Sequence, residues 1–155
     1  MATDMVNETA SFTVGVFKDL EWATKAFEAL ERQGFNPQTV SVMVRDTPQA
    51  AAFVETRLGK SPDRLTVARL GAVLAVGTLV DALNGDDNGL TTAGIAGTMR
   101  RAGFQAHDGQ IYETLTERGG VLVAIQDEPR SADALAVFLF HGGGNAAIGA
   151  WRGRV

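Results

Sequence analysis

The chain has 155 residues, of which 45% are hydrophobic and 21% charged, and this composition is typical of one folded domain. Its net charge of -4 argues against a general nucleic-acid binder, which normally presents a basic surface. The absence of cysteine excludes disulfides, thiolate metal sites and cysteine nucleophiles, and it fits a cytoplasmic protein.

Residues 12–46 are expected to form a first β-α-β unit. A strand near 12–17 is rich in β-favouring residues, and Asp19 can cap the helix that follows it. Gly34 is a suitable stop for that helix, and a second strand is expected near 39–45. The apolar residues of the helix recur at helical spacing, as Ala23, Ala26, Phe27 and Leu30.

Residues 47–119 are expected to be a mostly helical insert. Thr47-Pro48 and Ser61-Pro62 each combine an N-cap residue with proline at the first helical position. The most apolar run, Leu70–Val80, is shorter than the roughly 20 residues of a membrane span, so it predicts a buried helix and argues against membrane association. Four helices are predicted, near residues 48–58, 62–84, 90–101 and 106–118.

Residues 120–155 repeat the pattern of the first unit. A strand near 120–126 precedes a helix through Ala134, Leu135 and Phe138, and a last strand is expected near 146–152. The intervening "HGGG" begins at His141 and is interpreted as a turn. A phosphate-binding loop would place glycines between a strand and a helix N-terminus, whereas here they follow a helix, where carbonyl groups point outward.

Two β-α-β units in one sheet predict an α+β, ferredoxin-like β-α-β-β-α-β fold. The sheet is expected to hold four antiparallel strands, with the first and third in the centre. Residues 1–155 then form a single domain, with the helical insertion between the second and third strands.

The chain resembles the bacterial general stress proteins of the heat-induced stress-protein type. The resemblance covers most of residues 12–152, and it rests on "VGVFKDLEWATKAFEALERQGFNPQTVSVMVRD", "AGFQAHDGQIYETLTERGGVLVAI" and the "HGG" turn. It implies a stress-associated protein of this fold and brings no catalytic residues. The central segment Gly71–Gly97 departs from the small-residue helical hairpin of that family, because it carries Asp81, Asp86 and Asp87.

Two polar clusters are candidates for chemistry. Asn84–Gly89, "NGDDNG", has the opening spacing of a calcium loop, but the twelfth position is Ile95 instead of glutamate, so no metal site is predicted. His107, Asp108, Tyr112 and Glu113 lie within two helical turns. A His-Asp-Tyr set could do acid-base work, but it lacks a partner nucleophile, and helix capping with surface roles explains it better. No catalytic residue and no cofactor are predicted.

The strands "TVGVF", "VSVMV" and "VLVAI" are apolar almost continuously, which predicts that both faces of the sheet are covered. The second face must meet either the insert or another subunit. We therefore expect a non-enzymatic, stress-associated protein that acts through self-assembly or through a protein partner. The alternative is a module that binds and senses a small molecule or metabolite.

A homo-oligomer or a protein partner is the expected assembly, with no nucleic acid. The helix "ALAVFLF" is apolar nearly all round, which indicates that its outer side is buried too. The arginines at 100, 101, 152 and 154 could instead meet an acidic partner, although a solvated helix end explains the first two. The predicted interface residues are Val137, Leu139, Phe140, Trp151, Val73 and Leu74.

Overall fold

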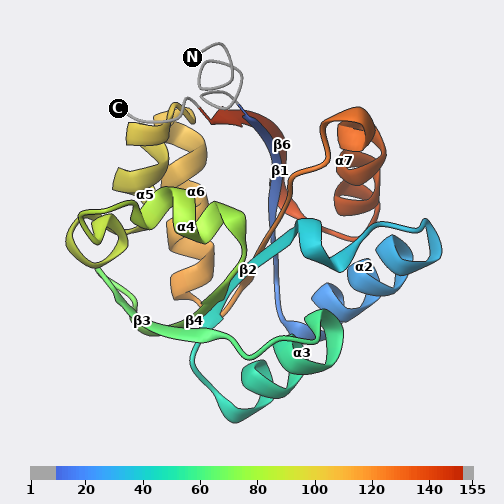
Figure 1. Cartoon of the computed structure of the whole chain (residues 1–155), viewed down its shortest axis with the longest axis horizontal. Helices are drawn as coiled ribbons and strands as arrows, with labels where there is room; N and C mark the ends of the chain where they lie inside the picture. The colour runs from blue at the N-terminus through green and yellow to red at the C-terminus, as the bar shows by residue number, and fades with distance from the viewer. Residues whose placement is uncertain (1–9, 152–155) are drawn as a thin grey trace.

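The computed structural model describes residues 10–151, and it contains an α+β fold built around one antiparallel sheet. The sheet has six strands in the order β3-β4-β2-β5-β1-β6 (Figure 1). In chain order the strands are β1 (Ala10–Phe17), β2 (Val40–Arg45), β3 (Asp63–Val67), β4 (Gly71–Val76), β5 (Val121–Ile125) and β6 (Gly144–Trp151).

Helices cover both faces of this sheet, three on each side (Figure 1). One face carries α2 (Leu20–Arg32), α3 (Pro48–Leu58) and α7 (Ser131–Phe140). The other face carries α4 (Thr78–Asn84), α5 (Gly89–Ala102) and α6 (Ala106–Glu117). Two short 3-10 turns, Pro37–Thr39 and Glu128–Arg130, precede β2 and α7.

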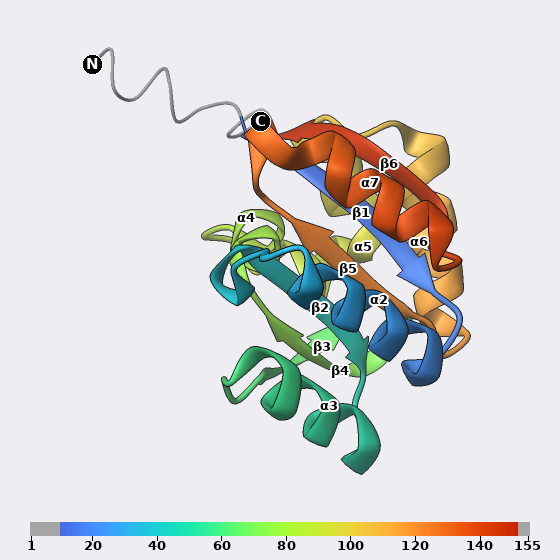
Figure 2. The same cartoon turned by 90° about the vertical axis from the view of Figure 1, so that its right-hand side faces the viewer.

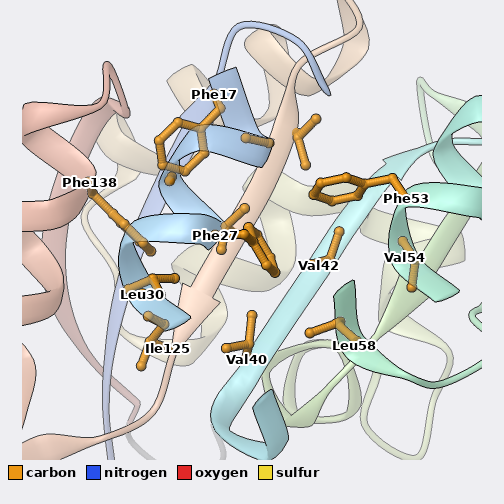
Figure 3. Close-up of a cluster of buried hydrophobic side chains, with 14 of the residues drawn as sticks. Phe17, Phe27, Leu30, Val40, Val42, Phe53, Val54, Leu58, Ile125 and Phe138 are labelled. Carbon is orange, nitrogen blue, oxygen red and sulfur yellow. The ribbon is translucent and has the colours of Figure 1, made fainter. Parts of the chain in front are cut away.

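The first face is held by aromatic contacts, one between the sheet and a helix and one between two helices (Figure 3). Phe17 of β1 meets Phe138 of α7 edge to face, with 5.4 Å between ring centroids. Phe27 of α2 meets Phe53 of α3 in the same way at 5.2 Å. Such pairs add about 0.5–1.5 kcal/mol to the free energy gained by burying the rings.

The second face is covered by the chain's own insert. Val14 and Val16 of β1 and Leu122 of β5 lie in one buried cluster with Leu90 and Ile95 of α5. Of the two possibilities left open by the sequence, the insert and not another subunit therefore covers this face.

Part of the insert was predicted wrongly, because residues 62–84 do not form one helix. They contain the hairpin β3–β4 and then α4, so the sheet has six strands instead of four and the insert is not purely helical. Ser61-Pro62 precedes a strand, and Arg69 and Gly71 make the turn with positive φ angles of 75° and 81°. An apolar run fits a buried strand as well as a buried helix, and here pairing with β2 decides between them.

Other local predictions are confirmed. Asp19 Oδ1 accepts a hydrogen bond of 3.0 Å from the Trp22 N–H and so caps α2. Thr47 Oγ1 caps α3 by accepting from the Ala50 N–H at 3.0 Å. β5 lies inside the sheet between β1 and β2, and a strand follows Gly143.

The junction of β4 and α4 depends on a close contact with β2. Leu79 donates its backbone N–H to the buried Ser41 Oγ at 3.0 Å. Gly77, which joins β4 to α4, has φ 113° and ψ 171°, a conformation that is essentially restricted to glycine. A Cβ at this position would lie 2.5 Å from Ser41 Cα, so the backbones can approach only because residue 77 has no side chain.

Gly77→Ala is therefore expected to cost about 3 kcal/mol of unfolding free energy, from backbone strain plus the collision with Ser41. Gly59→Ala is the matched control, because Gly59 also has a positive φ (67°) but nothing lies within 4 Å of a Cβ there. That control should cost about 1 kcal/mol, from strain alone. Urea unfolding measures both, and equal losses would show that the Ser41 contact does not constrain residue 77.

Candidate functional site

The outer face of α7 is the most exposed apolar surface among the described residues. The helix packs on the sheet through Ala134, Val137 and Phe138, all of which are buried. On its opposite side, Leu139 is 58% and Phe140 84% exposed, and among the side chains that the structure describes Trp22 is the other exposed large hydrophobic one. We call the exposed apolar residues the α7 outer face; they are Ala132, Ala136, Leu139 and Phe140.

The end of α7 is fixed by its turn into β6. His141 holds its Nδ1 2.9 Å from the carbonyl oxygen of Val137, and the Gly143 N–H donates to the Phe138 carbonyl at 2.7 Å. Gly142 has φ 79°, and a Cβ there would lie 3.6 Å from the Trp22 ring. The "HGGG" segment is thus the predicted turn, and it positions the last residues of α7 next to the start of α2.

β6 lies beside α7 at one edge of the sheet (Figure 2). Among the described residues it pairs with β1 and with no other strand. Residues 144–151 include no charged residue and no proline. The α7 outer face and the edge of β6 together form the candidate site.

The structure separates the predicted interface residues into two groups. Leu139 and Phe140 are exposed, whereas Val137 is 3% exposed and lies in the first core. Val73 and Leu74 are also buried, because they lie on β4 and point to opposite faces of the sheet. Val137, Val73 and Leu74, predicted as interface residues, are therefore buried in the chain's own core. The side chain of Trp151 lies outside the described part of the structure.

The polar residues at the start of α6 differ in their exposure to solvent. His107 is exposed and Asp108 is half-buried, while Tyr112 and Glu113 are buried. Burial, and then the negative charge of Asp108, raise the pKa of Tyr112 well above its usual range. Tyr112 thus remains a neutral phenol in the folded protein.

Glu113 has a structural role that the sequence did not reveal. Its Oε1 accepts a hydrogen bond of 2.9 Å from the Ala96 N–H, and its Oε2 pairs with Arg69 Nε at 3.1 Å. Both contacts lie at Gly94, where α5 is kinked with φ 78°. The buried carboxylate therefore caps the second half of α5 and connects it to the β3–β4 turn.

The "NGDDNG" segment is a turn between α4 and α5. Asp87 Oδ2 pairs with Arg101 Nη1 at 2.8 Å, and Asn84 Oδ1 accepts from the Leu90 N–H at 3.2 Å. Arg101 also donates to the Leu83 carbonyl at 2.9 Å, so this arginine holds the turn together. Among the residues that the structure describes, no three His, Cys, Asp or Glu side chains are close enough to hold a metal ion.

A cavity of about 290 Å³ lies where the ends of β1 and α6 meet the α7–β6 turn. Its apolar lining includes Val16, Phe17 and Leu115, and its two cations are Lys18 and Arg118. Neither cation forms an ion pair with an acidic side chain in the described part of the chain. The sequence analysis did not single out this cavity, because its residues are brought together only by the fold.

Comparisons with known proteins do not add a function. No protein-family model, no curated protein and no solved structure matches the chain. Within the described residues, the helices are too short or too polar to cross a membrane.

The raised pKa of Tyr112 predicts how stability depends on pH. The pKa of Tyr112 in the folded protein lies above its value of about 10 in the unfolded chain. The free energy of unfolding is therefore unaffected by this group below that pH, and it falls at higher pH as phenolate forms in the unfolded chain. Tyr112 is the only tyrosine, so phenolate absorbance reports on it alone. In urea it should titrate near its ordinary pKa, whereas in buffer phenolate should appear only together with loss of the circular dichroism signal. A reversible phenolate signal near the ordinary pKa in the folded protein would contradict this.

Proposed function

We propose that this chain is a non-enzymatic, cytoplasmic, stress-associated protein that acts through self-assembly at the α7 outer face. The resemblance of residues 12–152 to general stress proteins supports the stress association. The lack of cysteine supports a reducing compartment.

The exposure of Leu139 and Phe140 carries the proposal. These two adjacent side chains remain 58% and 84% exposed, although burying one such side chain fully is worth about 1.5–3 kcal/mol. Contiguous exposed apolar patches mark contact surfaces, and here Leu139 and Phe140 share one side of α7 with the exposed Ala132 and Ala136. The small side chains of Ala132 and Ala136 on the same face would let another helix approach closely.

A second argument comes from the coverage of the sheet. Both of its faces are already covered by the chain's own helices, so a partner is not required to complete the core. Assembly must then use an outer surface, and among the described side chains the α7 outer face is the most exposed apolar one.

We further propose that the core of the sheet has the ferredoxin-like topology. The order β2-β5-β1-β6 within the sheet supports this, as do α2 and α7 on one common face. In this interpretation β3 and β4 extend the four-stranded core beyond β2.

The double substitution Leu139→Glu and Phe140→Glu should convert the assembled protein into a folded monomer. Both side chains are exposed in the single chain, so charge there opposes association without disturbing the core. Val137→Glu is unsuitable, because this buried residue would destabilise the monomer itself. Light scattering measures the mass, and circular dichroism checks the fold.

The matched control is Gln49→Glu with Gln110→Glu, which adds the same charge at exposed positions on α3 and α6. It should leave the assembly intact. If the α7 variant stays assembled, or if the control dissociates equally, the α7 outer face is not the contact.

The alternative function, a small-molecule sensor, is favoured by the cavity next to Lys18 and Arg118. The cavity combines an apolar lining with two cations that have no acidic partner among the described residues. Such a lining suits a small organic carboxylate. Benzoate should therefore bind in a calorimetric titration, and uncharged benzamide should not. Lys18→Gln with Arg118→Gln should remove the binding, whereas Lys60→Gln with Arg32→Gln should retain it. Equal heats for benzoate and benzamide would contradict a site for an anion.

A further inference from the structure

The two edges of the sheet differ in how they are protected against pairing. The edge strand β3 has five residues and begins with Asp63 and Arg64, whose side chains are exposed. Arg64 is held by an ion pair of 2.9 Å with Asp46 on the neighbouring segment. Charges of this kind are a common device that prevents an edge strand from pairing with another chain.

The edge strand β6 lacks such protection. It has eight residues, and its sequence, "GNAAIGAW", contains neither a charge nor a proline. A bulge interrupts its register with β1 between Val14 and Val16, close to Gly144. From Ala147 to Trp151 the register is regular, so this half of β6 is an extended strand with one side open among the described residues.

We propose that β6 pairs antiparallel with β6 of a second copy of this chain, around a two-fold axis perpendicular to the sheet. This inference rests on the proposed self-assembly and specifies its geometry. An uncharged edge pairs most readily with another uncharged strand, because no charge is then buried without a partner. A second copy of β6 is such a strand. Two antiparallel copies of the same strand also satisfy the symmetry of a closed dimer, in which the same surface is used twice.

The position of α7 supports a second copy rather than an unrelated peptide. α7 packs over both β1 and β6, at the β6 end of its face (Figure 2). A two-fold axis perpendicular to the sheet keeps the faces aligned, so α7 of each copy would lie on the same side of the joined sheet. The two α7 helices would then flank the joint between the two β6 strands, because each packs over its own β6. An added peptide strand would bring no second α7 to this joint.

Hydrogen exchange of the wild-type chain tests this geometry. Backbone amides are measured at concentrations above and below the association midpoint, which is found by light scattering. Pairing should slow the outward-facing amides between Ala147 and Trp151 by about tenfold or more in the associated protein. The amides of β3, at the opposite edge, serve as the internal control and should exchange equally in both samples.

The outcomes separate this inference from the proposed function. Slowing confined to β6, with β3 unchanged, supports pairing at the β6 edge. Association without any change at β6 would overturn edge pairing and leave self-assembly through α7 intact. A chain that stays monomeric at every concentration would overturn both. Slowing at β3 instead of β6 would place the contact at the opposite edge of the sheet and overturn pairing through β6.

Discussion

The structure depends on the fact that its central strands are apolar on both sides. All five residues of β5 are buried, and so are the first five of the six residues in β2. A sheet of this kind is stable only when both faces are removed from water, because each exposed apolar strand face would lose the free energy of burial. The chain meets this requirement alone, with α2, α3 and α7 on one face and with α4, α5 and α6 on the other.

This coverage determines where the protein can meet a partner. Because neither sheet face is available, an assembly has to use the periphery of the three layers. One edge of the sheet, β3, carries the charged Asp63 and Arg64, which oppose pairing with another strand. The other edge combines the uncharged β6 with the exposed Leu139 and Phe140 of α7. Self-assembly at the β6 end is therefore the function that we propose. The cavity beside Lys18 and Arg118 is a separate candidate binding site for a small anion.

Local signals in the sequence predicted the parts of the fold that depend on neighbouring residues. Asp19 and Thr47 cap helices through hydrogen bonds three residues away, so their roles can be read from the sequence. Leu70–Val80 was misassigned because a buried strand and a buried helix are equally apolar, and only pairing with β2 distinguishes them. The Glu113 contacts with Ala96 and Arg69, and the cavity cations, join segments far apart in the chain, which no local pattern reveals. In the candidate site, the apolar helix led to Leu139 and Phe140 as predicted interface residues, but their exposure, which distinguishes them from Val137, required the structure.

Sedimentation equilibrium of the unmodified chain tests the central claim most directly, because it measures mass without a label or a substitution. At micromolar concentration the account predicts a species of twice the 16.4 kDa chain mass, which dissociates reversibly on dilution. A single species of 16.4 kDa across the whole range would contradict self-assembly and leave Leu139 and Phe140 as solvated residues.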